Sequence, residues 1–283
     1  MTQILKSKPV TDAIAADLAH RVERLHILGI NPTLAIVRVG ARPDDLSYER
    51  TAIKRAEALG LATRVFELPE GVSQEKLLLQ LRRINADSNI HGCLVFRPLP
   101  EGMEDKLICD ELAMHKDVDG VSTASLGAVF TDAKEGFAPC TAEACIRALD
   151  HYEIPIEGKH VVVVGRSLVV GKPVAMLLLR RNASVTICHS RTKDLPEVMR
   201  TADIVICATG RARAFGAECF REGQTVLDVG INFDKDGKLC GDVDYEVVEP
   251  IVDAITPVPG GLGSVTTSVT MEHTVFAAEK TVR

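Results

Sequence analysis

The stretch VVVVGRSLVVGKP, residues 161–173, decides the fold of one part of the chain. Its valines form a short buried strand, Gly165 ends that strand, and a helix begins a few residues later. The N-terminus of a helix offers unpaired N–H groups and a partial positive charge, which suit the phosphates of a dinucleotide. The spacing is G-R-S-x-x-x-G and not G-x-G-x-x-G. A plain tight turn between strand and helix therefore stays open as an alternative.

The next strand ends in CHSRT, residues 188–192. In dinucleotide-binding folds this strand end faces the adenosine ribose, and an acidic residue there binds the 2′-hydroxyl of NAD. No acidic residue is present here, and Ser190 and Arg191 favour the 2′-phosphate of NADP. A solvated surface charge at Arg191 is an open alternative, and so is NAD as the cofactor.

Strands and helices alternate on either side of this stretch. The alternation predicts parallel sheets covered by helices, and therefore an α/β fold in two lobes. Apolar runs and glycine stops place the expected elements of the first series at 33–39, 46–59, 63–68, 73–84 and 92–96. Those of the second series are expected at 160–164, 174–181, 184–188, 195–200, 204–208 and 225–229, with flanking helices at 142–151 and 268–280.

The composition is that of a soluble globular protein. Apolar residues make up 46% of the 283 residues, charged residues 25%, and the net charge is -6, so nucleic acid is not an expected partner. The start lacks the apolar core of a signal peptide and no run is long enough to span a membrane, so we expect a cytoplasmic protein without membrane contact. The 8 cysteines show no metal-ligand spacing, which predicts reduced core residues and no metal.

Short motifs along almost the whole chain resemble one family, the bifunctional methylenetetrahydrofolate dehydrogenase/methenyltetrahydrofolate cyclohydrolases. Tyr48 follows Gly40 and Pro43 at the family's spacing, and GRSLVVGKP (165–173) resembles its dinucleotide signature. The other matching motifs are KDVDG (116–120), PCT (139–141), LDVGIN (227–232), GDV (241–243) and TPVPGGLG (256–263).

The resemblance implies an architecture and two reactions. Residues 1–141 and 264–283 are expected to form a folate-binding catalytic lobe, and residues 142–263 a Rossmann-like NAD(P)-binding lobe. The C-terminal helix is expected to return to the first lobe, folate to bind between the lobes, and the chain to form a homodimer. The family oxidises 5,10-methylenetetrahydrofolate by hydride transfer to NAD(P)⁺ and then hydrolyses the methenyl ring to 10-formyltetrahydrofolate.

The same resemblance implies roles for individual residues. Tyr48 would stack on the folate ring system and Asp119 would anchor the pterin, so these two are the expected catalytic residues. Without the family match, Tyr48 reads as a packing aromatic and Asp119 as a turn carboxylate. The expected substrate-binding residues are Tyr48, Phe96, Asp119, Gly260, Gly261 and Gly263. The expected cofactor-binding residues are Gly165, Arg166, Ser167, Gly171, Ser190, Arg191 and Ile231.

The chain departs from the family at the position of its catalytic lysine. The family pattern is Y-x-x-x-K, which puts both side chains on one helix face. Here that position is Ala52, and Lys54 lies on another face of the helix. Arg55 does share the face of Tyr48, but a guanidinium cannot give up its proton at working pH.

Further departures accompany the missing lysine. The glutamine that accompanies the lysine in the family is Phe96 here, followed by Arg97. Asp45, Ala142 and Ser264 also stand where the family usually has serine, proline and proline. These changes predict a methylenetetrahydrofolate dehydrogenase whose cyclohydrolase activity is weak or absent. Two alternatives stay open: a fully bifunctional enzyme in which Arg55, Arg97 or water replaces the lysine, and a non-catalytic or altered-substrate paralogue.

Overall fold

The computed structural model describes residues 1–282 and separates into two compact units. One unit comprises Met1–Thr11 and Thr141–Thr266, and we call it the six-stranded unit after its main sheet. The other comprises Asp12–Cys140 and the chain from Thr267 onward, and we call it the three-stranded unit. Three helices contain the points at which the chain passes from one unit to the other: α1 (Ser7–Ile27), α6 (Cys140–His151) and α10 (Gly263–Glu279).

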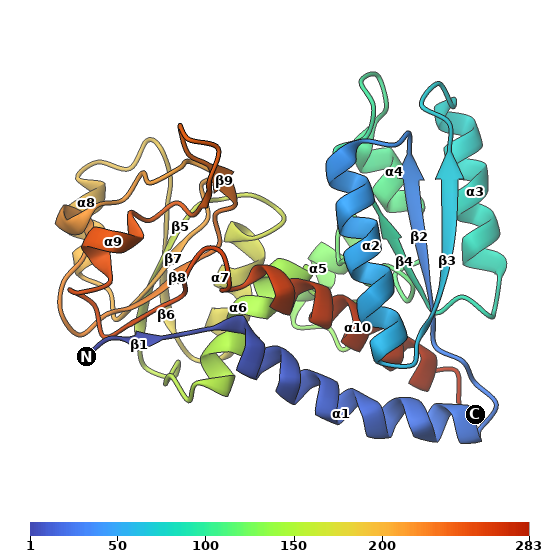
Figure 1. Cartoon of the computed structure of the whole chain (residues 1–283), viewed down its shortest axis with the longest axis horizontal. Coiled ribbons are helices and arrows are strands. Elements are labelled where there is room, and N and C mark those ends of the chain that lie inside the picture. The colour runs from blue at the N-terminus through green and yellow to red at the C-terminus, as the bar shows by residue number, and fades with distance from the viewer. Residues whose placement is uncertain (283) are drawn as a thin grey trace. The chain divides into compact units, whose positions relative to one another are not determined.

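The three-stranded unit is a parallel sheet in the order β3-β2-β4, surrounded by helices (Figure 1). Its strands are β2 (Thr33–Val39), β3 (Ala62–Leu68) and β4 (Gly92–Val95). Every residue of β2 and β4 is buried, as expected of apolar strands covered on both faces. The connecting helices are α2 (Pro43–Ala58), α3 (Gln74–Ala86), α4 (Asp105–Glu111) and α5 (Thr123–Thr131).

The six-stranded unit is a parallel sheet in the order β1-β11-β8-β7-β5-β6. The order turns back at β5, which pairs with both β6 and β7, as in a doubly wound nucleotide-binding sheet. Its strands are β1 (Gln3–Ile4), β5 (His160–Val164), β6 (Ser184–Cys188), β7 (Ile204–Cys207), β8 (Thr225–Asp228) and β11 (Ala254–Ile255). The remaining elements are α7 (Gly171–Arg180), α8 (Leu195–Arg200), a 3-10 turn (Ala217–Cys219), α9 (Tyr245–Val248) and the hairpin β9 (Asn232–Phe233) and β10 (Leu239–Cys240).

The expected elements agree with the observed ones to within a few residues. The fold class is confirmed, and β2, β5, β6 and α8 begin and end where the sequence predicts. Ser73 is the N-cap of α3, and its side chain accepts a hydrogen bond from the Lys76 N–H. Helix α1 and the two-residue strands β1 and β11 are absent from the sequence-based prediction.

The N-terminus groups differently from the expected lobes. The prediction assigned all of residues 1–141 to the first lobe, whereas Met1–Thr11 belong to the six-stranded unit. The physical reason is that β1 pairs with β11, so that Gln3 lies opposite Ala254. From Thr267 onward α10 belongs to the three-stranded unit. That one lobe binds folate and the other binds the dinucleotide stays a prediction.

Three general features concern the described residues, 1–282. No helix among them is long and apolar enough to cross a membrane. No group of three or more His, Cys, Asp or Glu side chains among them could hold a metal ion. All the cysteines are free and buried, as the sequence predicts.

Candidate active site

Tyr48 lies on α2 and contacts Phe96, the residue that follows β4. The two ring centroids are 5.3 Å apart and the rings are tilted by 52°. Phe96 is 6% exposed, whereas Tyr48 is 36% exposed. A ring that is supported by a second aromatic and still partly exposed can stack on a planar ligand.

Charge pairing fixes the start of α2. The Arg42 guanidinium donates from Nε and Nη2 to the two carboxylate oxygens of Asp45, at 3.0 and 2.9 Å. Pro43 occupies the first turn, where its missing N–H leaves no hydrogen bond unmade. Asp45 is buried in this pair and stabilises the helix start, so its carboxylate is not presented to a ligand.

Ala52 lies one turn after Tyr48 and is fully buried, with 0% of its surface exposed. Lys54, the only lysine of α2, is exposed. Arg55 is half-buried, and its Nη1 donates to the Ser268 Oγ of α10 at 2.7 Å. The face of α2 that carries Tyr48 therefore has a buried methyl group, and no amine, one turn after that residue.

The hydroxyl of Tyr48 is the enclosed end of a partly exposed side chain. Burial raises its pKa well above the ordinary value, and the Asp119 carboxylate and Cys140 thiol raise it further. A hydrogen bond with Thr267 acts in the opposite direction but does not reverse the shift. The phenol therefore stays protonated at neutral pH, and it can position a ligand but not act as a base.

The first two residues of the KDVDG motif stabilise the fold. Lys116 is buried, and its Nζ donates to the carbonyl oxygens of Ile84 and Asp87 at 2.8 and 2.7 Å. These carbonyls lie at the end of α3, where helix carbonyls lack partners. Asp117 is fully buried and accepts hydrogen bonds from two backbone N–H groups and a serine hydroxyl at the start of α5.

Asp119 follows these two residues and is only partly buried. Burial raises the pKa of its carboxyl to about 6, against the opposing attraction of Arg97. The next residue, Gly120, has a φ of +67°, and a Cβ there would meet the Ala138 carbonyl carbon at 2.5 Å. Only glycine therefore allows the close turn that follows Asp119.

The turn after β5 depends on close backbone contacts at two glycines. A Cβ on Gly165 would lie 2.3 Å from the carbonyl oxygen of Ala208, and a Cβ on Gly171 would lie 2.2 Å from that of Gly165. Both contacts are with backbone, which cannot move aside. The glycines bring the end of β5 against the start of α7, as in the family's dinucleotide turn.

The residues between these glycines fit a phosphate. Arg166 and Ser167 are exposed, and Lys172 is exposed in the first turn of α7. The Ser167 hydroxyl accepts a hydrogen bond from the Val170 N–H at 3.1 Å and shapes the turn. Two cations beside a helix N-terminus form an anion-binding surface, which suits the pyrophosphate of a dinucleotide.

The loop after β6 presents a serine and a cation. The His189 N–H donates to the Thr192 Oγ1 at 2.9 Å, and the Arg191 N–H donates to the His189 Nδ1 at 3.1 Å. These bonds fix a tight turn from which Ser190 and Arg191 are exposed. The turn at 189–192 has the hydroxyl and guanidinium that suit a 2′-phosphate, and none of its residues is acidic.

Comparison with known proteins decides the family. Residues 5–119 match the model of the tetrahydrofolate dehydrogenase/cyclohydrolase catalytic domain, and residues 139–282 match that of the NAD(P)-binding domain of the same enzymes. The chain belongs to the tetrahydrofolate dehydrogenase/cyclohydrolase family. The resemblance stated from the motifs is thereby confirmed, and the chain is an enzyme of this family with an NAD(P)-binding domain.

Relatives in the family match over nearly their whole length. The chain is 53% identical to the bifunctional protein FolD of Carboxydothermus hydrogenoformans, covering 99% of this chain and 98% of that one. The crystal structure of the bifunctional enzyme FolD from Campylobacter jejuni has a TM-score of 0.96 at 37% identity and covers 99% of both chains. The Trypanosoma brucei enzyme, complexed with NADP cofactor and inhibitor, has a TM-score of 0.93 at 33% identity and covers 100% of this chain and 99% of that one.

The structure gathers the candidate residues of this family member into two sets. Tyr48, Phe96 and Asp119 lie in the three-stranded unit, where Tyr48 contacts Phe96 and interacts electrostatically with Asp119. The other predicted residues lie in the six-stranded unit: Gly165, Arg166, Ser167, Gly171, Ser190, Arg191, Ile231, Gly260, Gly261 and Gly263. Their roles toward ligands stay predictions.

Two buried aspartates organise the loops of the family's LDVGIN and GDV motifs, and the sequence analysis assigned them no role. Asp242 accepts hydrogen bonds from the Thr209 hydroxyl at 2.8 Å, the Arg211 N–H at 2.9 Å and the Asn232 amide at 2.9 Å. Asp228 accepts three backbone N–H groups at 2.9 to 3.0 Å. These carboxylates hold the loops at the carboxyl ends of β7 and β8, where ligands bind in such sheets. The signal in the sequence was an acidic residue at the end of a strand, as in Asp228, or directly after a glycine, as in Asp242.

The glycine-rich motif TPVPGGLG leads into α10. A Cβ on Gly261 would lie 2.4 Å from the Pro257 carbonyl oxygen, and Gly260 has a φ of +100°. Gly263 begins α10, and a Cβ there would meet the Ile231 Cδ1 at 4.0 Å, an ordinary van der Waals distance. Ile231 is 65% exposed directly after the Asp228 loop. The first two glycines are required by the turn itself, whereas Gly263 is free of such contacts.

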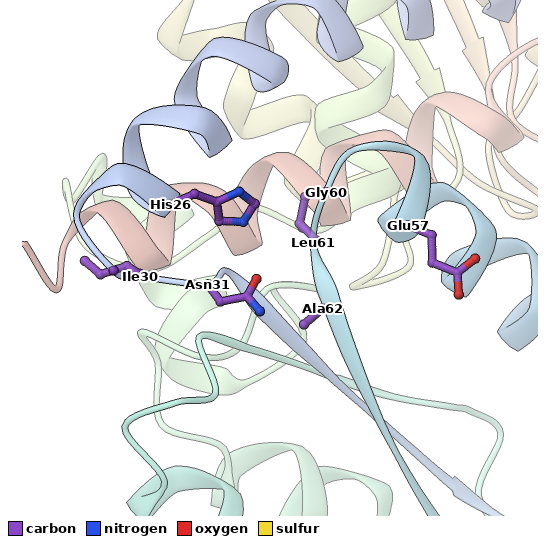
Figure 2. A pocket seen from close by; sticks show the side chains of 8 residues that line it. His26, Ile30, Asn31, Glu57, Gly60, Leu61 and Ala62 are labelled. Atoms are coloured by element: carbon purple, nitrogen blue, oxygen red, sulfur yellow. The ribbon is translucent and has the colours of Figure 1, made fainter.

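A hollow of about 600 Å³ lies at the other end of the three-stranded sheet. Figure 2 shows its lining, in which the His26 ring lies near Gly60 and Leu61. The hollow borders the residues that precede β2 and β3, whereas Phe96 follows β4. Ligands of parallel α/β sheets bind at the carboxyl ends of the strands, so this hollow is not the candidate active site.

Proposed function

We propose that the chain oxidises 5,10-methylenetetrahydrofolate to 5,10-methenyltetrahydrofolate by hydride transfer to NADP⁺, with little or no hydrolysis of the methenyl ring. The observation that carries this proposal is the buried Ala52 one turn after Tyr48, at the position of the family's lysine. Phe96, in contact with Tyr48, occupies the position of the family's glutamine.

The two reactions of the family make different demands on the protein. Bound NADP⁺ supplies the hydride acceptor. The protein must hold the methylene carbon of the substrate in place, which is a matter of positioning. Hydrolysis of the methenyl ring also needs proton transfer to and from water and a ring nitrogen, and a positioned acid–base group contributes roughly 10²–10⁴-fold to such a step. Replacing lysine by alanine therefore affects the second reaction far more than the first.

Neither neighbouring arginine substitutes for the lysine. Arg55 donates to the Ser268 hydroxyl, and Arg97 lies 3.4 Å from the Asp105 carboxylate. A guanidinium stays protonated at any working pH, so it can bind an anion but cannot exchange protons with water. These contacts favour structural and electrostatic roles for both side chains.

The three-stranded unit supplies the proposed aromatic and carboxylate contacts with the folate. Tyr48 stacks on the ring system of the substrate with its ring supported by Phe96. The Asp119 carboxylate anchors the pterin by accepting hydrogen bonds from its N–H groups. Gly260, Gly261 and Gly263 allow the backbone of their loop to come close to the ligand.

The six-stranded unit supplies the proposed cofactor contacts. The turn from Gly165 to Gly171, with Arg166 and Ser167, binds the pyrophosphate at the N-terminus of α7. Ser190 and Arg191 bind the 2′-phosphate, and Ile231 packs against the cofactor. NADP in the Trypanosoma brucei relative supports this preference, and NAD is the alternative.

A two-stage assay tests the proposal. Purified protein is mixed with 5,10-methylenetetrahydrofolate and either NADP⁺ or NAD⁺, and the near-ultraviolet absorbance of the methenyl product is followed. We expect the product to build up and then decay only at the rate seen without enzyme. Decay that depends on enzyme concentration would contradict the loss of cyclohydrolase activity.

A fully bifunctional enzyme is the second candidate. The names of relatives such as the Carboxydothermus hydrogenoformans protein favour it, since they are called bifunctional. In the assay it predicts build-up followed by catalysed decay. Absence of build-up with both cofactors would favour the third candidate, a paralogue that binds a folate or nucleotide without this turnover.

Two further expectations concern the state of the protein. We propose a homodimer, which light scattering on the purified chain tests by its mass. We also propose a cytoplasmic location, which fractionation of the source cells tests.

A further inference from the structure

Helix α10 buries a series of polar side chains in the three-stranded unit. Each of the five is at most 8% exposed: Thr267, Ser268, Thr270, His273 and Thr274. Burying polar groups costs free energy unless they are hydrogen-bonded. The hydrogen-bond partners of these side chains therefore show which parts of the unit they hold in place. Three of the partners belong to the segments of the proposed folate site: Tyr48, Cys140 and Val118.

The contact of His273 is made with the backbone. Its Nδ1 lies 2.8 Å from the carbonyl oxygen of Val118. A carbonyl only accepts hydrogen bonds, so Nδ1 carries the hydrogen and donates it. The Cys140 thiol donates to the same oxygen at 3.1 Å, and together the two donors match its two lone pairs. The imidazole also stacks on Phe137, with centroids 4.6 Å apart.

The Val118 carbonyl belongs to the peptide that leads directly into Asp119. Lys116 and Asp117 fix the chain before this peptide through their buried hydrogen bonds. Gly120 fixes it on the other side by its close approach to Ala138. The hydrogen bond from His273 holds the peptide plane itself, and with it the direction in which the Asp119 side chain leaves the backbone.

We propose that His273 is a positioning residue for Asp119, because its Nδ1–H holds the Val118 carbonyl and thereby the peptide from which the carboxylate reaches the substrate. The inference rests on the proposed role of Asp119 as the pterin anchor. His273 acts through Asp119 and needs no contact with substrate. Removing its donor should therefore weaken folate binding while NADP binding is unchanged.

Three single variants separate positioning from structural support. His273→Phe keeps a ring against Phe137 but removes the donor, and His273→Asn places an amide N–H near the position of Nδ1. Val275→Ala is the matched control, since Val275 is fully buried on α10 and lies outside this contact. We expect His273→Phe to raise the KM for the folate roughly 10-fold or more, with the KM for NADP⁺ unchanged. His273→Asn should restore most of the affinity, and Val275→Ala should lower the Tm without changing either KM.

The pH profile gives a readout that a structural role would not change. The ionised carboxylate of Asp119 is the proposed anchor, and its pKa is raised to about 6, so kcat/KM for the folate should fall as pH decreases through that value. The titratable and charged groups that act on this carboxylate are Arg97, Asp117, Cys140 and Tyr48. His273→Phe should move this limb of the profile, and Val275→Ala should leave it in place.

Asp119→Asn separates a failure of this inference from a failure of the proposed function. If His273 acts through Asp119, adding His273→Phe to Asp119→Asn should not raise the folate KM further. An unchanged folate KM in Asp119→Asn alone would refute the anchor, and with it the basis of the inference. A raised KM in Asp119→Asn would support the anchor. Three results would then overturn the inference alone. One is that His273→Phe raises the folate KM as much in the Asp119→Asn variant as in the wild type. The others are that His273→Asn raises this KM as much as His273→Phe does, or that Val275→Ala changes it equally.

Discussion

Two residues, Ala52 and Phe96, give the sharpest test of the proposed loss of the second reaction. Ala52 is fully buried, so a lysine introduced alone at position 52 would lose its hydration, and the Phe96 side chain has no polar atom that could accept a hydrogen bond from it. We expect Ala52→Lys to hydrolyse methenyltetrahydrofolate no faster than the wild type. The double variant Ala52→Lys/Phe96→Gln should gain roughly 10²-fold or more, because the amide both creates room and binds the amine.

The control for this pair is Ala52→Met/Phe96→Gln, which has a side chain of similar length without the amine. The measurement is the enzyme-dependent decay of the methenyl absorbance. Equal decay rates in the lysine and methionine double variants would contradict the idea that the missing acid–base group limits hydrolysis.

The role of a residue can be predicted from the sequence in some cases and not in others. Ala52 was predictable because the positions of Tyr48 and Ala52 depend only on the period of one helix. The roles of Asp242 and His273 were not, because their partners lie far away in the sequence: Asp242 binds the loop at 209–211, and His273 binds the carbonyl of Val118. A single sequence shows the polar residue but not the distant group to which it is hydrogen-bonded.

At the scale of elements, apolar runs that end at glycine or proline identified the central strands well. β2 and β5 are buried along nearly their whole length, so apolar residues dominate their sequences. Helix α1 was missed although its apolar residues recur at helical spacing: Val10, Ile14, Leu18, Val22 and Leu25 are all buried. The strands β1 and β11 have two residues each, and only their pairing defines them.

The loop after β6 is the element on which, in our proposal, the choice of cofactor depends. Arg191 is exposed there, while its backbone N–H is held by His189. We expect Arg191→Ala to raise the KM for NADP⁺ roughly 10-fold or more, since it removes a charge-assisted contact with the 2′-phosphate. The KM for NAD⁺ should change little, because NAD has no phosphate at that position. Steady-state kinetics with both cofactors measure this.

Lys193→Ala is the matched control for Arg191→Ala, since it removes an exposed cation from the same loop. A general loss of positive charge would affect both variants alike. Equal changes of the two KM values in Arg191→Ala would refute the role of Arg191 in choosing NADP.

At the scale of the whole molecule, the alternation of strands and helices was enough to predict two α/β lobes. The assignment of Met1–Thr11 was not predictable, because it depends on the pairing of β1 with β11 about 250 residues away.

The dependence of folding stability on pH is likewise a property of the whole chain. Burial raises the pKa of Asp119 and of Asp228 to about 6, which makes the folded state less stable as pH rises. Burial lowers the pKa of His91 and His115, which makes the folded state more stable as pH rises.

The difference in free energy of unfolding between the wild type and Asp119→Asn isolates the contribution of Asp119, because the other titrating groups are present in both proteins. The folded pKa of Asp119 is raised above the ordinary 3.8 to about 6, so its ionised form costs stability above pH 6, and this cost disappears as pH falls toward 4. The variant has no such charge. The free energy of unfolding of the variant minus that of the wild type should therefore be larger at pH 7 than at pH 5, by about 1 kcal/mol. Urea unfolding followed by circular dichroism at both pH values measures this, and a difference that does not change with pH would show that Asp119 titrates normally in the folded chain.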